Sequence, residues 1–245
     1  MRQRLDNALV ALGLVQSRAR AADLIARGAV RIDGIVAGKA GQLVSSSAVL
    51  DVDRAANAYV ARSGAKLEAA LTAFGFEPAG RVALDVGAST GGFTQVLLQG
   101  GASCIYAVDV GHGQLAPVLR DDPRVVNLER CDARGLTEAQ VPRPVSAVVA
   151  DVSFISLTAV LGAALRLAAP DAWLVALVKP QFELGRGVVG KGGIVRAPEA
   201  RERAVTAVSA WLTTQGWRVV GDLPSPLPGK DGNVEHLIGS VRNAG

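Results

Sequence analysis

The segment VALDVGASTGGF, residues 82–93, constrains the fold of this chain more than any other stretch. Four apolar residues surround Asp85 and predict a buried strand, which is followed by Gly87, Gly91 and Gly92. Glycine lets a backbone turn sharply and approach a ligand closely, so the segment predicts a strand, a ligand-binding turn and a helix from about Phe93. An ordinary strand-to-helix turn of an α/β protein is the alternative, but so many glycines would weaken such a turn needlessly.

The order of the glycines favours S-adenosyl-methionine over a dinucleotide as the ligand. The dinucleotide pattern G-x-G-x-x-G is not met, and a carboxylate, Asp85, precedes the first glycine, where it can face the cationic amino-acid end of the cofactor. A nicotinamide oxidoreductase remains the alternative. The cofactor contacts that we expect in this segment are Asp85, Gly87, Ala88, Ser89, Thr90, Gly91, Gly92 and Phe93.

Two further carboxylates follow the next strands. Asp109 lies where a carboxylate takes the ribose hydroxyls of an adenosine. Asp132 is expected to face the adenine edge, with a plain loop carboxylate as the alternative.

Strand and helix patterns alternate after this segment. We expect strands over 82–86, 104–108, 124–128, 145–150, 172–178, 217–222 and 234–241, and helices over 66–74, 93–98, 114–120, 157–168 and 198–215. This alternation predicts an α/β, Rossmann-like fold with a mostly parallel, doubly wound, seven-stranded sheet. Ligands of such sheets bind outside the carboxyl ends of the strands.

Composition indicates a globular protein, with 49% hydrophobic and 20% charged residues. The mean hydropathy is +0.29, yet no apolar run reaches the roughly 20 residues that span a bilayer. Asp6 and Asn7 interrupt the entry to the first apolar run, which argues against a secretory signal. Cys104 and Cys131 have no metal-site or disulfide spacing, so we expect core residues and a cytoplasmic protein.

Residues 1–58 form a small basic unit, with eight Lys and Arg against five Asp. Helix patterns cover 4–12 and a stretch that starts at Ser17, and the turn Asp33-Gly34 joins two short strands. Residues 59–62 are the expected linker to a second domain, 63–245. An RNA-phosphate role is expected for Arg4, Arg18, Arg20, Arg27 and Arg31, with an ordinary solvated face as the alternative.

Lysines and carboxylates gather at one predicted edge of the sheet. Asp151 and Lys179 each end a strand, Glu235 begins the last one and Lys66 precedes the sheet. A lysine deprotonates a ribose hydroxyl only when it is neutral, which burial and a neighbouring cation favour, and two lysines supply that cation to each other. The set suits methyl transfer to a ribose hydroxyl, for which a sulfonium donor requires no metal. A salt bridge at the rim is the alternative for Lys179, and a solvent-facing strand residue for Glu235.

A glycine-rich segment at 185–193 nearly matches the phosphate loop of ATPases. Gly192 replaces the magnesium-binding hydroxyl, and no strand precedes the segment, so we do not expect ATP binding. Arg186 and Lys191 instead suit a basic lid over an RNA backbone, and an ordinary disordered loop is the alternative.

Two resemblances bring these features together. The motifs Arg4-Leu5-Asp6, Ser17-Arg18, Gly28-Ala29-Val30 and Asp33-Gly34 resemble the S4 RNA-binding domain. The motifs GASTGGF, DVGHGQL, ADVSFISL, LVKPQFE and GNVEH resemble the FtsJ/RrmJ-like ribose 2′-O-methyltransferases, and the whole chain resembles the TlyA family, also labelled hemolysin A.

The resemblance implies S-adenosyl-methionine-dependent methylation of a cytidine ribose in 16S or 23S rRNA, with rRNA or ribosomal subunits as partners. It also implies a catalytic tetrad of Lys66, Asp151, Lys179 and Glu235. A non-catalytic S4-type RNA-binding factor is one alternative. A membrane-lytic protein is another, disfavoured because the sequence has no apolar span.

Overall fold

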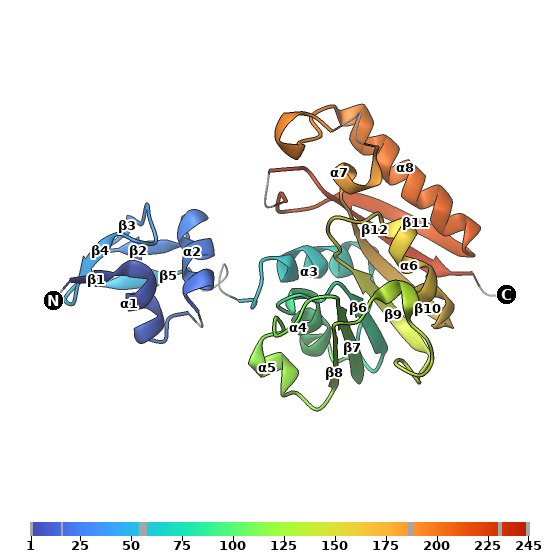
Figure 1. Cartoon of the computed structure of the whole chain (residues 1–245), viewed down its shortest axis with the longest axis horizontal. Coiled ribbons are helices and arrows are strands. Elements are labelled where there is room, and N and C mark those ends of the chain that lie inside the picture. The colour runs from blue at the N-terminus through green and yellow to red at the C-terminus, as the bar shows by residue number, and fades with distance from the viewer. Residues whose placement is uncertain (1, 16, 54–57, 186–188, 230–231, 244–245) are drawn as a thin grey trace. The chain divides into compact units, whose positions relative to one another are not determined.

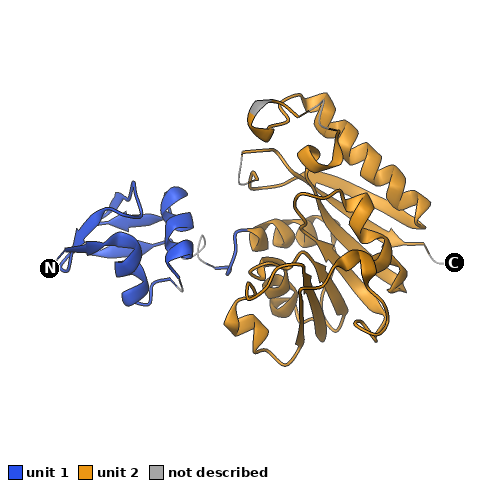
Figure 2. Ribbon diagram, viewed as in Figure 1, with its two compact units in different colours: residues 1–62 blue, residues 63–245 orange. Residues whose placement is uncertain are grey.

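The computed structural model describes residues 2–15, 17–53, 58–185, 189–229 and 232–243. The chain divides into two compact units, Met1–Arg62 and Ser63–Gly245 (Figure 2). Residues 59–62, the expected linker, belong to the first unit by this division. None of the described helices is both long and apolar enough to cross a bilayer.

The first unit holds two helices and two small sheets. Its elements are β1 (Arg2–Arg4), α1 (Leu5–Ala11), α2 (Arg18–Ala26), β2 (Val30–Ile32), β3 (Ile35–Val36), β4 (Leu43–Ser45) and β5 (Leu50–Val52). Strands β3, β2 and β5 form one sheet, and β1 pairs with β4. Both expected helices and the hairpin are confirmed: Ser17 caps α2 by accepting a hydrogen bond from the backbone of Arg20, and Asp33 and Gly34 take positive φ in the turn. Strands β1, β4 and β5 were not predicted.

The second unit is a doubly wound α/β domain (Figure 1). Its strands are β6 (Val82–Val86), β7 (Cys104–Asp109), β8 (Val125–Glu129), β9 (Val145–Ala150), β10 (Ala168–Val178), β11 (Trp217–Pro224) and β12 (His236–Arg242). Its helices are α3 (Ser63–Phe74), α4 (Gly92–Gln99), α5 (Pro117–Arg120), α6 (Leu157–Arg166), α7 (Pro180–Glu183) and α8 (Pro198–Thr214), with short 3₁₀ helices at Ala133–Gly135 and Lys191–Gly193.

The seven strands form one sheet in the order β11-β12-β10-β9-β6-β7-β8. Neighbours from β10 to β8 pair in parallel, whereas β12 runs antiparallel to both β10 and β11. The predicted mostly parallel, seven-stranded sheet is therefore confirmed. Because the chain leaves β6 for β7 on one side and later returns to β9 on the other, the strand order reverses at β6. A ligand of this fold binds at such a reversal, outside the carboxyl ends of the strands.

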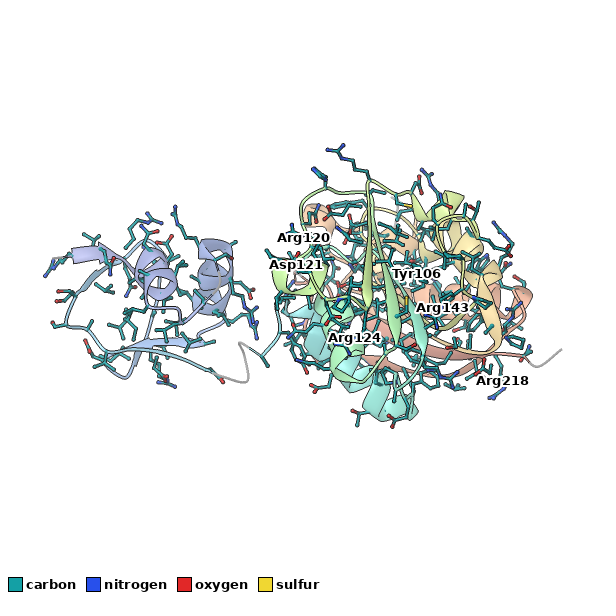
Figure 3. The ribbon with its side chains drawn as sticks, turned by 90° about the horizontal axis from the view of Figure 1, so that it is seen from below. Tyr106, Arg120, Asp121, Arg124, Arg143 and Arg218 are labelled. Atoms are coloured by element: carbon teal, nitrogen blue, oxygen red, sulfur yellow. The ribbon has the colours of Figure 1, made fainter. Side chains whose placement is uncertain are left out.

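Alternation along the strands explains how helices cover the sheet. Val82, Leu84 and Val86 of β6 belong to a core that also contains Leu161 of α6 and Val208 of α8. Successive strand residues point to opposite faces, so the residues between them face the other layer. Helices α3 and α4 pack against each other, as do α6 and α8. Surface ion pairs join Arg120 to Asp121 and Arg124 to Asp122. Figure 3 labels the side chains of Arg120, Asp121 and Arg124.

Three expected boundaries differ from the structure. The last strand begins at His236, so Glu235 lies just before it. Strand β10 begins at Ala168, where a helix was expected to continue, and α6 ends at Arg166. The helix expected over 114–120 is a single turn, because Pro117 occupies its first position and residues 113–115 are held by Glu129 instead.

Candidate active site

Neighbouring segments of the protein closely surround the glycine turn that follows β6. Gly87 has φ of +85°, and a Cβ there would lie 2.7 Å from the backbone oxygen of Asp151. Gly91 caps α4 in the left-handed conformation, and a Cβ there would strike Leu119. Close contacts with neighbouring segments therefore favour glycine at both positions, and ligand binding by this turn stays a prediction.

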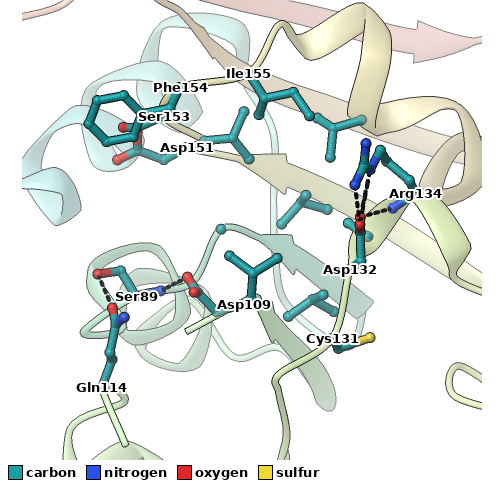
Figure 4. A pocket seen from close by; sticks show the side chains of 17 residues that line it. Ser89, Asp109, Gln114, Cys131, Asp132, Arg134, Asp151, Ser153, Phe154 and Ile155 are labelled. Atoms are coloured by element: carbon teal, nitrogen blue, oxygen red, sulfur yellow. Dashed lines mark hydrogen bonds and ion pairs between the residues drawn. The ribbon is translucent and has the colours of Figure 1, made fainter. Parts of the chain in front are cut away.

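A pocket of about 500 Å³ opens at the strand-order reversal (Figure 4). It is lined by residues that follow β6, β7, β8 and β9. The lining residues include Gly87, Ser89, Asp109, Val110, Gln114, Cys131, Asp132, Arg134, Asp151, Ser153, Phe154 and Ile155. Of the expected cofactor contacts, Gly87, Ser89, Asp109 and Asp132 line the pocket, whereas Asp85, Ala88, Thr90, Gly91, Gly92 and Phe93 do not.

The carboxylate of Asp109 is fixed by the loops around it. Its Oδ2 accepts a hydrogen bond from the backbone N–H of Ser89 at 2.8 Å, and its Oδ1 accepts one from Gly111 at 2.7 Å. Ser89 also donates through its hydroxyl to Gln114. A carboxylate has about four acceptor sites, so Asp109 keeps acceptor capacity for the two hydroxyls of a ribose.

Asp132 is hydrogen-bonded to Arg134, which was not among the predicted site residues. Arg134 donates to both oxygens of Asp132 (Figure 4). These hydrogen bonds hold the pKa of Asp132 at about 2. The apolar wall beside this pair, with Val110 and Ile155, offers a surface for a flat base. Cys131, expected in the core, is half-buried here, while Cys104 is buried as predicted.

Asp85 lies beneath the turn and not in the pocket. It is fully buried, and its Oδ2 accepts a hydrogen bond from the Thr94 hydroxyl at 2.6 Å. Its Oδ1 has no hydrogen-bond partner within the described residues. Burial raises the pKa of Asp85 to about 7; the Thr94 hydrogen bond opposes this rise, and the charges of Asp151 and Asp109 add to it. The buried carboxyl therefore changes charge near neutral pH.

The four residues of the expected tetrad form two ion pairs. Lys66 Nζ lies 2.5 Å from Glu235 Oε2, and both side chains are about 5% exposed or less. Lys179 Nζ lies 2.7 Å from Asp151 Oδ1 and donates a hydrogen bond to Ser153 Oγ at 2.9 Å. Asp151 also lines the pocket, so one of the two pairs adjoins it.

Sheet register explains how residues so distant in sequence meet. Val178 and His236 are partners in the β10–β12 ladder, so Lys179 and Glu235 leave the sheet at the same edge. Ala150 pairs with Ala176 in the β9–β10 ladder, which brings Asp151 to that edge as well. Because β12 is antiparallel, its start, and not its end, lies beside the carboxyl ends of its neighbours.

Phe154 is a feature that sequence reasoning missed. The residue is 91% exposed at the pocket, although large aromatic residues are rarely so open to water. Its φ is +66°, a strained conformation for a bulky residue. The ring contacts that of Phe182 with centroids 5.2 Å apart. An exposed aromatic face at a pocket suits the stacking of a planar group.

Two family models match this chain. The S4 domain model matches residues 3–50 and the FtsJ-like methyltransferase model matches residues 59–242. A 16S/23S rRNA (cytidine-2′-O)-methyltransferase TlyA of Mycobacterium tuberculosis is 52% identical over 238 residues, which are 97% of this chain and 89% of the relative. The chain belongs to the TlyA family of FtsJ-like methyltransferases.

Solved structures agree with membership of the TlyA family. A hemolysin candidate from Streptococcus thermophilus is 37% identical, with a TM-score of 0.79 over 99% of this chain and 89% of that one. A magnesium protoporphyrin IX methyltransferase of Synechocystis with bound S-adenosyl-homocysteine matches 74% of this chain and 82% of its own. Its TM-score is 0.52 at 17% identity, which is a likeness of fold alone.

In the S4 domain of this TlyA-family chain, arginines share aspartates. Arg4 and Arg18 both bind the buried Asp6, at 2.9 and 3.1 Å. The hydrogen bond from Arg4 is the main cause that lowers the pKa of Asp6. Arg20 and Arg27 likewise share Asp23, and Arg31 donates to the backbone oxygen of Gly34.

The side chains of these arginines differ in their exposure to solvent. The side chains of Arg4 and Arg18 are 47% and 60% exposed, whereas that of Arg20 is 9% exposed. Arg4 and Arg18 are therefore open to a phosphate, and Arg20 has largely an internal role in the unit as it stands.

The expected basic lid falls mostly outside what can be described. Arg186 lies outside the described residues, and of Lys191 only the backbone is described, in the 3₁₀ helix Lys191–Gly193. The end of the segment is anchored by the buried Asn233, which accepts a hydrogen bond from the backbone of Val195 and donates one to the backbone oxygen of Gly193.

Proposed function

We propose that this protein transfers the methyl group of S-adenosyl-methionine to the 2′-hydroxyl of a cytidine ribose in ribosomal RNA. The observation that carries the proposal is the occurrence of two ion pairs at the carboxyl ends of the parallel strands. The Lys66–Glu235 pair is buried, and the Lys179–Asp151 pair adjoins the pocket through Asp151. Membership of the TlyA family and the name of the Mycobacterium tuberculosis relative support the choice of rRNA and cytidine.

The residues of the pocket fit S-adenosyl-methionine. Asp109 keeps acceptor capacity for the ribose hydroxyls of the cofactor, and the apolar wall at Val110 and Ile155 suits its adenine. Gly87 lines the pocket and presents no side chain to it. When bound, the cofactor supplies an electrophilic methyl group on a sulfonium.

Side chains of this protein accept the proton of the ribose hydroxyl and hold the base in position. When S-adenosyl-methionine is bound, methyl transfer to the ribose oxygen would break its carbon–sulfur bond, and Lys179 Nζ, in its neutral form, would take the hydroxyl proton. Asp151 holds Lys179 at the pocket, and Glu235 holds Lys66 as the second cation of the site. In general-base catalysis, much of the rate enhancement comes from accurate placement of the hydroxyl relative to the base.

A labelled-methyl assay tests this function. Lys179→Ala is expected to abolish transfer to naked rRNA and to ribosomal subunits, while calorimetry shows cofactor binding and circular dichroism shows the fold unchanged. Arg81→Ala is the matched control, since it removes an ion-paired cation at the amino ends of the strands, away from the pocket. Ribose methylation is mapped by resistance to alkaline cleavage. Near-normal transfer by Lys179→Ala, or a methyl group found on a base, would contradict the proposal.

A further inference from the structure

The Lys179 nitrogen has two close neighbours of different kinds. Asp151 Oδ1 is 2.7 Å away, yet this oxygen has no hydrogen-bond partner within the described residues. The contact is therefore ionic and lies off the direction of a hydrogen bond. Ser153 Oγ, at 2.9 Å, accepts a hydrogen bond from the same nitrogen. The directional restraint on Lys179 thus comes from the serine and not from the carboxylate.

Direction matters for a lysine that acts as a base. Rotation about the Cε–Nζ bond of a lysine turns the three positions on its nitrogen, each of which holds a hydrogen or the lone pair. An ionic contact fixes the distance from the nitrogen to the carboxylate but not this rotation. A hydrogen bond holds one of the three positions, because its strength falls steeply with angle. In the neutral amine one of the positions is the lone pair, which must face the ribose hydroxyl.

The loop that carries Ser153 is tied to the segment that carries Lys179. Glu183 of α7 accepts hydrogen bonds from the Ser156 hydroxyl at 2.5 Å and from the backbone of Leu157 at 2.9 Å. Further ties come from the Phe154–Phe182 ring contact. These contacts hold the two segments together just beyond the Ser153–Lys179 hydrogen bond, so its geometry is built into the fold.

We propose that Ser153 is a positioning residue that sets the rotation of the Lys179 amine toward the substrate hydroxyl. The proposal rests on the proposed function in that it takes Lys179 as the base. Ser153 neither gives nor takes a proton in the reaction; the hydroxyl proton still passes to Lys179 Nζ. Ser153 is exposed, so the site has room for the extra methyl group of a threonine.

The test compares Ser153→Ala with Ser153→Thr. Ser103→Ala is the matched control, because it removes a serine hydroxyl that donates to backbone oxygens at the amino ends of the strands, away from Lys179. We expect Ser153→Ala to lower kcat for methyl transfer to ribosomal subunits by roughly ten- to a hundredfold, with the cofactor Kd changed by less than about twofold. Ser153→Thr keeps the acceptor oxygen and is expected to retain kcat within about threefold.

A second measurement is independent of activity. The chain has five lysines, Lys39, Lys66, Lys179, Lys191 and Lys230, so ¹³C-lysine labelling gives few signals. We expect the order parameter of the Lys179 ε-carbon to fall in Ser153→Ala and to stay at its wild-type value in Ser153→Thr and Ser103→Ala.

Wild-type kcat in Ser153→Ala would overturn the proposal, as would an equal loss in the alanine and threonine variants. An unchanged Lys179 order parameter in Ser153→Ala would also overturn it. Should the wild-type protein transfer no methyl group to any rRNA, the proposed function fails by itself, and the order parameter still decides whether Ser153 orients Lys179.

Discussion

The side chain of Asp85 couples the stability of the methyltransferase domain to pH. Burial raises its pKa to about 7, well above the usual range of an aspartate carboxyl. In the unfolded chain this carboxyl loses its proton near pH 4, whereas in the folded chain it keeps the proton until about pH 7. Its contribution to stability is therefore fully present below pH 4 and is lost as the pH rises through 7.

Asp85→Asn removes this dependence. We expect the melting temperature of the wild-type protein to fall between pH 5 and 8 relative to that of Asp85→Asn, because the amide cannot ionise and its oxygen can still accept from Thr94. Thermal unfolding of both proteins across this range measures the difference in slope. Parallel curves would show that Asp85 does not titrate there.

Sequence patterns predict the candidate catalytic residues only up to a point. Asp151 and Lys179 stand out because each polar residue ends an apolar strand. Lys66 and Glu235 do not stand out in this way, since their pairing with each other depends on the position of α3 beside β12. The exposure of Phe154 depends on tertiary structure in the same way, and a solitary aromatic residue in a loop carries no sequence signal of it.

At the scale of elements, the turn from β6 into α4 is tightly enclosed by neighbouring segments. We expect Gly87→Ala to lower the free energy of unfolding by more than Gly80→Ala does. Both positions have positive φ, but a Cβ at Gly80 meets no atom within 4 Å, whereas one at Gly87 meets the backbone of Asp151 at 2.7 Å. The control bears only the conformational cost, of about 1–2 kcal/mol.

Urea unfolding measures both free energies, and calorimetry measures cofactor affinity alongside. We expect Gly87→Ala to lose cofactor affinity as well, because the turn must shift away from Asp151 at the wall of the pocket. Equal losses of stability in the two variants would show that the backbone contact at Gly87 is easily relieved.

The larger elements were predictable because their patterns are long and regular. Strands β6, β7 and β9 are mostly apolar and almost wholly buried, typical of a parallel sheet covered on both faces. Strands β1, β4 and β5 are three residues each, too short for a period of two to be recognised in their sequences. The start of β10 was missed because its first residues, Ala168 to Asp171, include Pro170 and an exposed aspartate.

At the scale of the molecule, each unit has a hydrophobic core of its own. One core contains Leu5, Leu9 and Leu24 of the first unit, and another contains Leu84 and Leu174 of the second. Units with separate cores can fold independently. The functions proposed for them are therefore open to separation by truncation.

Removing residues 1–58 is expected to weaken rRNA binding and to reduce its dependence on salt, because the truncation removes eight Lys and Arg against five Asp. The pocket is lined by residues between Val86 and Val160, so cofactor affinity is expected to stay within about twofold. Filter binding at several salt concentrations and calorimetry measure the two affinities. Equal RNA affinity in the truncated and full-length proteins would contradict the assignment of the S4 domain as the RNA-binding unit.

The position of β12 has a consequence for the order in which this protein is assembled and comes apart. Strand β12 lies between β10 and β11 in the sheet but follows both in the chain. During synthesis the whole pocket can therefore form before Glu235 emerges from the ribosome. Local unfolding that detaches the β11–β12 hairpin separates Glu235 from Lys66 and leaves the pocket in place. We expect such a partly opened molecule still to bind the methyl donor but to lack the Lys66–Glu235 ion pair.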